Sequence, residues 1–169
     1  MEDRMFMNRT LFSVRTMILT AEKERTQLQK YNSDYQAQLA ELNSYRRKLL
    51  FSANDEDAMS NLVTLVNELE ITRNRLDALK NNLSTLLSAA LSSIVMIIES
   101  TQDLRLGLMP RLRNEIRSIT RIVEDTRGVN VNYSALVSVA IRGTLLLTTK
   151  DNGSEITKRL FIALKNAVV

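Results

Sequence analysis

The sequence contains no cysteine and no histidine. These absences exclude disulfides, thiolate zinc sites, cysteine nucleophiles and imidazole acid–base catalysis. Glycine-rich phosphate loops are missing too, because the four glycines stand apart from one another. Acidic residues such as Glu99, Asp103 and Glu115 form no recognisable catalytic pair. We therefore expect a protein that is not an enzyme, with no catalytic, cofactor-binding or metal-binding residues.

Residues that interrupt regular structure are scarce, with four glycines and one proline among 169 residues. So few interruptions predict a helical chain or one built from long elements. Tryptophan is absent and aromatic residues make up 5% of the chain, so aliphatic residues and methionine must fill the core. The length is sufficient for one domain with its own core. The 44% hydrophobic and 25% charged residues are typical of soluble domains.

The net charge is +4 and the sequence pI is about 9.6. This mild basicity permits contact with nucleic acid or anionic lipid without requiring it. The first twelve residues start acidic and include Arg9, whereas a signal peptide has a basic start and then an uninterrupted apolar run. We therefore expect no signal peptide, and a location in the cytoplasm or within an assembled particle.

Two series of apolar residues recur every seven positions, one from Met7 to Leu49 and the other from Leu62 to Leu104. Spacing of this kind, sustained over about six heptads, predicts long helices that pack along one another. We call the central members of both series the heptad seam. They are Leu28, Tyr35, Leu42, Leu49, Leu62, Leu69, Leu76 and Leu83.

Between the two series lies YRRKLLFSANDEDAMSN, residues 45–61. Cations at the end of one helix and anions at the start of the next both suit the helix dipole. Ser52 or Asn54 can cap the second helix, and Leu49, Leu50 and Phe51 can close the tip. The stretch therefore predicts the bend of an antiparallel hairpin. Its charged tip residues are Arg46, Arg47, Lys48, Asp55, Glu56 and Asp57.

Residues 81–98 carry no charge, whereas residues 21–80 are polar away from the seam. A helix that is apolar over most of its circumference must be buried on several sides. We therefore expect an all-α protein, in which a coiled-coil-like hairpin stalk at 21–80 joins a small helical bundle. This bundle, the head, comprises 1–20 and 81–169, and stalk and head form one continuous structural unit.

The uncharged run 81–98 also suggests an alternative. It is about as long as the shortest membrane span, and Ser84, Ser88 and Ser92 recur every four residues. Small residues at that spacing let helices approach closely, in water or in a membrane. Because Asn81, Asn82 and the hydroxyl residues dilute the run, we favour a buried helix of the head and keep membrane contact as the alternative.

After residue 107 three further segments are expected. Pro110 suits the first turn of a helix that Gly128 would end. Ser134 can cap a helix through about Thr148, and Ser154 can cap the last one. The β-branched residues of the segment that begins at Ser134 leave another possibility open. A short C-terminal β-hairpin would then pair residues 144–149 with 155–162.

Arg113, Arg117 and Arg121 are spaced four apart and form a row along one helix face, with Arg105 and Arg111 nearby. Such an arginine row could grip phosphates or an acidic partner. We favour a solvated face whose side-chain stems cover apolar neighbours, with local relief from Glu115 and Asp125. No named nucleic-acid-binding module is present.

Burying one seam residue is worth roughly 1.5–3 kcal/mol, while ordering each residue costs about 1–2 kcal/mol. The stalk is therefore marginal alone, and we expect it to pack on copies of itself or on other protein subunits. The favoured hypothesis is a non-enzymatic structural or assembly subunit that oligomerises through long helices; a virion or phage component would fit. The alternatives are a basic adaptor, binding nucleic acid or an acidic partner through the arginine row, and a membrane-active helical protein.

Overall fold

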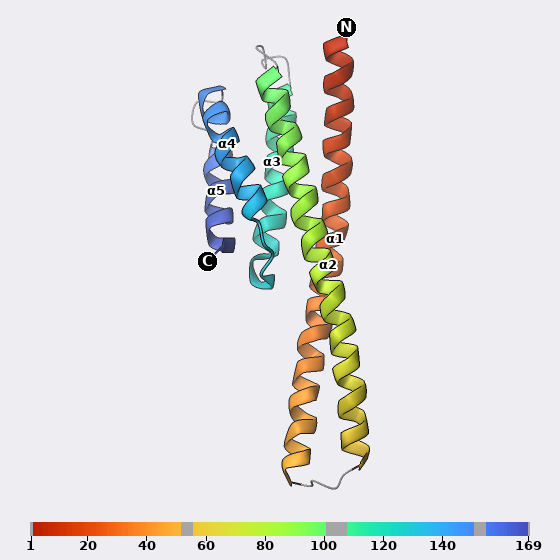
Figure 1. Cartoon of the computed structure of the whole chain (residues 1–169). Helices are drawn as coiled ribbons and strands as arrows, with labels where there is room; N and C mark the ends of the chain where they lie inside the picture. The colour runs from red at the N-terminus through yellow and green to blue at the C-terminus, as the bar shows by residue number, and fades with distance from the viewer. Residues whose placement is uncertain (1, 52–55, 101–107, 151–154, 169) are drawn as a thin grey trace. The chain divides into compact units, whose positions relative to one another are not determined.

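The computed structural model describes residues 2–51, 56–100, 108–150 and 155–168 (Figure 1). Within these ranges the chain forms five α-helices and one short 3₁₀ turn, η1, at Arg127–Val129, and it forms no strand. The all-α prediction is confirmed. The helices are α1 Glu2–Phe51, α2 Glu56–Ser100, α3 Leu108–Asp125, α4 Ser134–Lys150 and α5 Glu155–Val168. Several residues singled out above lie outside the described ranges, namely Ser52, Asn54, Asp55, Asp103, Leu104, Arg105 and Ser154.

The chain divides into two compact units. Unit 1 comprises Met1–Arg25 and Lys80–Val169, and unit 2 comprises Thr26–Leu79. Unit 2 contains only parts of α1 and α2, which lie side by side (Figure 1). The guanidinium of Arg75 lies 5.7 Å from the ring centroid of Tyr31, a cation–π contact between the two helices. The buried apolar residues among the described residues of unit 2 are Leu28, Ala58, Leu65, Leu69, Leu76 and Leu79.

The ends of α1 and α2 that face residues 52–55 carry the expected charges. Lys48 lies in the last turn of α1, and Glu56 and Asp57 lie in the first turn of α2. The prediction that Leu50 and Phe51 close the tip is wrong, because these side chains are 82% and 92% exposed. Leu49 continues the heptad spacing, but each following residue is rotated by about 100° around the helix, away from the seam.

Unit 1 contains α3, α4 and α5 together with the remaining parts of α1 and α2. Helix α3 packs on α5, and α5 also contacts α4. The C-terminal half of α2 lies in the core, where Leu83, Leu87, Leu91 and Ile94 have no exposed surface. Helix α3 contributes Leu112, Ile116, Ile119 and Val123, which recur at helical spacing on one face.

Two ion pairs join α1 to α3. Arg15 Nη1 lies 3.4 Å from Glu115 Oε2, and Arg25 Nη1 donates a 3.0 Å hydrogen bond to Asp125 Oδ2. The two arginines are ten residues apart, and so are their partners. Because residue numbers increase in the same direction along both helices, α1 and α3 run parallel. Glu115 and Asp125, which were expected to offset the charge of the arginine row, thus also form ion pairs between helices.

The turn between α3 and α4 differs from its prediction. Helix α3 ends at Asp125, three residues before Gly128, and the left-handed residue is Asn130, with φ 59° and ψ 48°. Asparagine tolerates this conformation because its short polar side chain can bond locally. Ser134 is the first residue of α4, and its N–H donates to Asn132 Oδ1 at 3.0 Å. Asn132 thus performs the capping role expected of Ser134.

Helix α4 reaches α2 through a glycine. A Cβ built on Gly143 would lie 2.7 Å from Val95 Cγ2, closer than two carbon atoms can pack. The buried residues Leu136, Ala140 and Gly143 are separated by four and three positions, which is the period of a helix and not of a strand. Residues 144–150 and 155–162 are helical, so the alternative β-hairpin is not adopted.

We predict that Gly143→Ala destabilises the protein by about 1–2 kcal/mol. The methyl group overpacks against the buried Val95, which outweighs the gain from removing glycine from a helix. Urea unfolding followed by circular dichroism measures the change.

Gly128→Ala is the matched control, because a Cβ at Gly128 meets nothing within 4 Å. It should leave the free energy of unfolding unchanged or raised by up to about 1 kcal/mol. Equal effects of the two substitutions would contradict the close α4–α2 contact.

Candidate interaction surfaces

The arginine row lies along α3, and the structure gives its members different surroundings. Arg113 is half-buried and takes part in an interaction within the chain. Arg117 is exposed and donates to Asn114 Oδ1 at 3.1 Å, while Arg111 and Arg121 are exposed. These groups therefore do not form a uniform row of free guanidiniums, and Arg105 lies outside the described residues.

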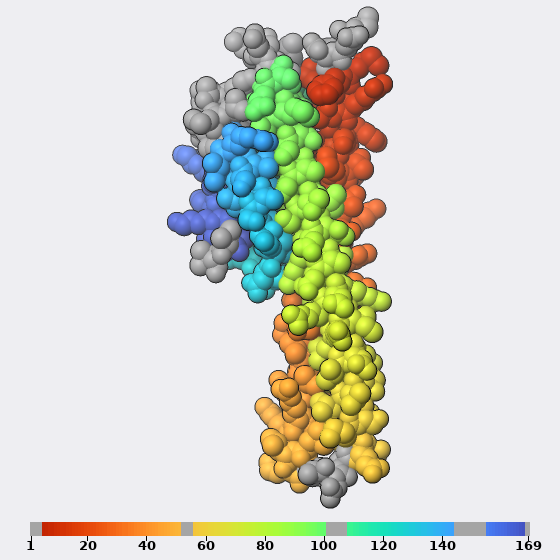
Figure 2. Space-filling model, in the orientation of Figure 1, coloured from red at the N-terminus to blue at the C-terminus, as the bar shows by residue number. Residues whose placement is uncertain are grey.

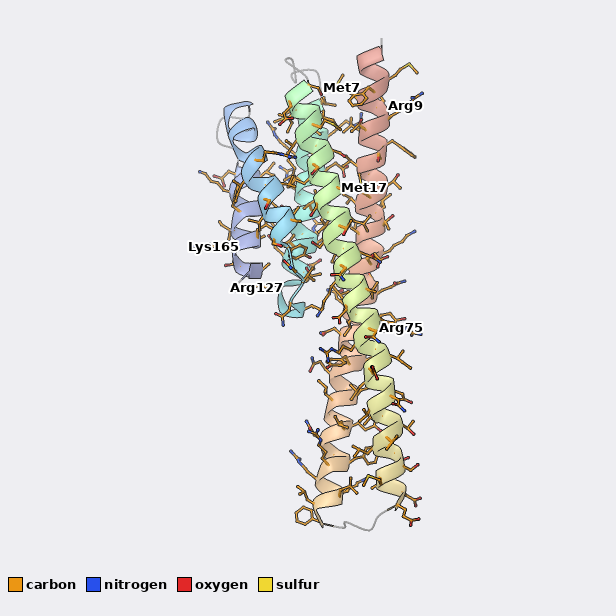
Figure 3. The ribbon with its side chains drawn as sticks, in the orientation of Figure 1. Met7, Arg9, Met17, Arg75, Arg127 and Lys165 are labelled. Atoms are coloured by element: carbon orange, nitrogen blue, oxygen red, sulfur yellow. The ribbon has the colours of Figure 1, made fainter. Side chains whose placement is uncertain are left out.

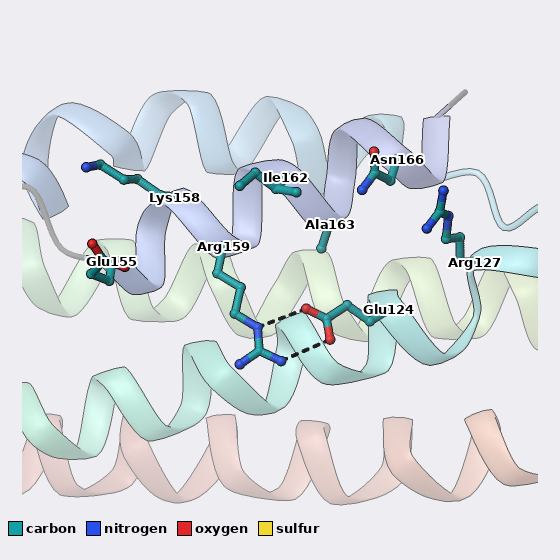
Figure 4. Close-up of a pocket in the computed structure, with 8 residues that line it drawn as sticks. All are labelled: Glu124, Arg127, Glu155, Lys158, Arg159, Ile162, Ala163 and Asn166. Carbon is teal, nitrogen blue, oxygen red and sulfur yellow. Dashed lines mark hydrogen bonds and ion pairs between the residues drawn. The ribbon is translucent and has the colours of Figure 1, made fainter.

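Glu124 and Arg159 link α3 to α5 by a two-pronged ion pair (Figure 4). Arg159 Nε donates to Glu124 Oε1 at 3.0 Å, and Nη2 donates to Oε2 at 3.1 Å. This hydrogen bonding lowers the pKa of Glu124 despite partial desolvation of its carboxyl, and the charges of Arg159 and Arg121 act in the same direction. The paired geometry orients α5 on α3 in addition to balancing charge.

A surface pocket of about 660 Å³ surrounds this ion pair (Figure 4). Charged groups of both signs line it, together with Ile162, Ala163 and Asn166. Among the described residues, no three acidic side chains gather closely enough to hold a metal ion. The pocket therefore has the character of a charged crevice between α3, η1 and α5. Its charged lining residues are Glu124, Arg127, Glu155, Lys158 and Arg159.

The heptad seam and the tip occupy different environments. Within the seam, Leu28, Leu69, Leu76 and Leu83 are buried. The remaining seam residues are half-buried: Tyr35, Leu42, Leu49 and Leu62. Five of the tip residues are exposed, namely Arg46, Arg47, Lys48, Glu56 and Asp57, and Asp55 lies outside the described residues.

The small residues of α2 face the interior of unit 1. Ser84, Ser88 and Ser92 are half-buried, and Ser84 Oγ donates to the carbonyl of Asn132 at 2.7 Å. Within the described residues, α2 is the one helix that is long and apolar enough to span a membrane by length and composition, and 44% of its apolar window is buried inside the chain. The core helix of a soluble protein passes the same test.

Sequence reasoning missed two exposed apolar surfaces. The α1 stripe consists of Met5, Phe12 and Leu19, and the α2 stripe consists of Met59, Val63 and Val66. Phe12 is 75% exposed. The sequence does contain a pattern for each stripe: a second seven-residue repeat in α1 and steps of four and three residues in α2. The heptad seam has the same spacing on the same helices, so the stripes could not be told apart from it.

Comparison with protein-family models, with curated proteins and with solved structures gives no match. The surfaces of the chain therefore have to be interpreted from their own chemistry.

Tyr133 is a buried polar group that belongs to the core. It is 1% exposed, and its hydroxyl shares a 2.6 Å hydrogen bond with Thr126 Oγ1. Burial raises the pKa of Tyr133 to about 12, and the hydrogen bond offsets only part of that effect. The phenol must therefore stay neutral in the folded protein, where it ties the start of α4 to the end of α3.

We predict that Tyr133 makes the protein sensitive to alkaline pH. Its pKa is about 12 when folded and about 10 when unfolded, so its contribution is complete below pH 10 and is lost as the pH rises towards 12. The loss should reach about 2–3 kcal/mol. The free energy of unfolding of wild type minus that of Tyr133→Phe, measured between pH 9 and 12, isolates this effect. A difference that is constant over the window would contradict it.

Proposed function

We propose that this protein is a non-enzymatic structural or assembly subunit that oligomerises through its long helices in a larger complex. In this proposal α1 and α2 form an antiparallel, coiled-coil-like hairpin over residues 21–80, joined to a small helical bundle. Its partners are copies of itself and other protein subunits. The observation that carries the proposal is the exposed apolar surface on these two helices.

The exposed residues are large and belong mainly to the long helices. Besides the two stripes, Leu50, Phe51 and Ile71 are each more than half exposed. Single exposed apolar residues are normal, but groups of them on one surface mark sites of protein contact. Among the described residues of unit 2 the helices are parts of α1 and α2, and in this proposal another subunit covers the apolar residues that they leave exposed.

The arginine row and the apolar part of α2 support the other functions less well. Arg113 and Arg117 already interact within the chain, and the hydrogen bond of Arg117 to Asn114 occupies one of the N–H donors that a phosphate backbone would need. The serine-containing run of α2 contributes Leu87, Leu91 and Ile94 to the core of unit 1, so membrane insertion would have to open that unit.

We predict that the purified protein has a native mass that is a multiple of its 19.2 kDa chain mass. Apolar side chains that are exposed in one chain gain free energy on burial, at about 25 cal/mol per Å². Light scattering coupled to size-exclusion chromatography gives the mass. A concentration series of about 1–100 µM covers dissociation constants on the order of those of moderately stable complexes. A single monomeric species throughout would contradict the proposal.

A further inference from the structure

The α1 stripe and the α2 stripe each lie away from the buried face of their own helix. In α1, Phe12 is about 100° around the helix from the buried Leu11, and Met5 and Leu19 repeat its position at intervals of seven. In α2, Met59 and Val66 are also seven apart, with Val63 between them. Neither stripe can be covered by the neighbour that covers the seam.

Charges of opposite sign flank the two stripes. Arg9 and Lys23 lie beside the α1 stripe, and Glu56 and Glu70 lie beside the α2 stripe. All four side chains are exposed, and no ion pair joins any of them to another described residue. Figure 3 shows Arg9 directed away from the neighbouring helices, and Figure 2 shows α2 forming an open surface over residues 56–79.

The spacing of these charges also matches. Arg9 and Lys23 are fourteen residues apart, as are Glu56 and Glu70. If the two segments are aligned in parallel with Arg9 opposite Glu56, then Lys23 lies opposite Glu70. The same register sets Phe12 opposite Met59, Thr16 opposite Val63 and Leu19 opposite Val66. It continues to Lys30 opposite Asp77, and over residues 9–30 and 56–77 it brings no two like charges together.

Pairing each stripe with itself lacks this complementarity. Two α1 stripes in parallel would set Arg9 against Arg9, and an antiparallel pair centred on Thr16 would set Arg9 against Lys23. An antiparallel pair of α2 stripes centred on Val63 would set Glu56 against Glu70. Like charges at close range oppose association, and complementary charges select the partner and fix the register.

We propose that the α1 stripe of one chain docks in parallel on the α2 stripe of a second copy, with Arg9 and Lys23 paired to Glu56 and Glu70. The inference rests on the proposed assembly function and specifies its contact. Each chain carries one α1 stripe and one α2 stripe. Because these two surfaces differ, the contact between chains is heterologous. Repetition of a heterologous contact produces a ring or a filament, depending on whether its rotation closes.

Two variants that each disable one surface test this arrangement. Phe12→Glu removes the α1 stripe and leaves the α2 stripe intact, while Val63→Glu does the reverse. Both residues are exposed, so the fold should persist, and circular dichroism checks the helix content. Ser13→Glu and Thr64→Glu are matched controls, because each adds the same charge one position along, about 100° off the stripe.

Each disabled variant alone should run as a monomer, and the two controls should assemble as wild type does. An equimolar mixture of Phe12→Glu and Val63→Glu should form a complex of two chains and no larger. One chain then supplies the intact α1 stripe and the other the intact α2 stripe, and the two remaining surfaces are disabled. Light scattering distinguishes this two-chain complex from the 19.2 kDa monomer.

The outcomes separate this inference from the function on which it rests. Wild-type protein that stays monomeric overturns the assembly function and the docking together. Wild-type assembly that persists in both disabled variants overturns the docking alone. Disabled variants that stay monomeric when mixed overturn the heterologous pairing of the stripes.

The charges test the register. Arg9→Glu combined with Lys23→Glu should raise the dissociation constant of the two-chain complex at least about tenfold, because two attractions become repulsions. Adding Glu56→Lys and Glu70→Lys on the other chain should restore it to within about threefold. Failure of the reversed charges to restore binding overturns the parallel register.

Discussion

The narrow heptad seam is the constraint on which the structure depends. It gives α1 and α2 one buried face each, and the remaining circumference needs other partners. In unit 1 the partners include α3 for α1 and α4 for α2, and Leu87 and Leu91 of α2 have no exposed surface. In unit 2 the described residues form parts of α1 and α2 alone, and apolar residues such as Val63 are exposed. The same helix is therefore a core element in one unit and an open surface in the other.

Charge is used differently between α3 and its neighbouring helices and along the exposed stripes. Glu115, Asp125 and Glu124 hold arginines from other helices, so these ion pairs orient α3 against α1 and α5. Exposed pairs of this kind add little stability each, but their geometry selects one arrangement of the helices. The arginine row was predicted as a possible binding surface from its four-residue spacing. The carboxylates of the same helix, by contrast, pair with arginines of α1 and α5.

The sequence predicted the all-α class because scarce glycine and proline and a seven-residue repeat both favour long helices. Three features could not be derived from spacing. Arg15 and Glu115 are a hundred residues apart, and only the packed structure brings them together. Glycine and asparagine both tolerate the left-handed conformation, so the sequence could not show that Asn130 adopts it. A glycine within a helix ordinarily lowers its stability, but Gly143 permits α4 to approach Val95 of α2 closely. The stripes were hidden because a heptad seam and an outward stripe share one period.

The separation of charge between the stripes bears on the direction of assembly. A net charge of +4 suggests a uniformly basic protein, yet the cations beside Phe12 and the anions beside Val63 lie on different helices. A surface of one sign repels its own copy, whereas two surfaces of opposite sign on one chain attract each other between copies. In the proposed docking, charge disfavours closed, symmetric pairs and favours head-to-tail contacts, which continue from chain to chain. Under that proposal one kind of chain carries both unequal surfaces, so copies of it alone are sufficient to extend the assembly.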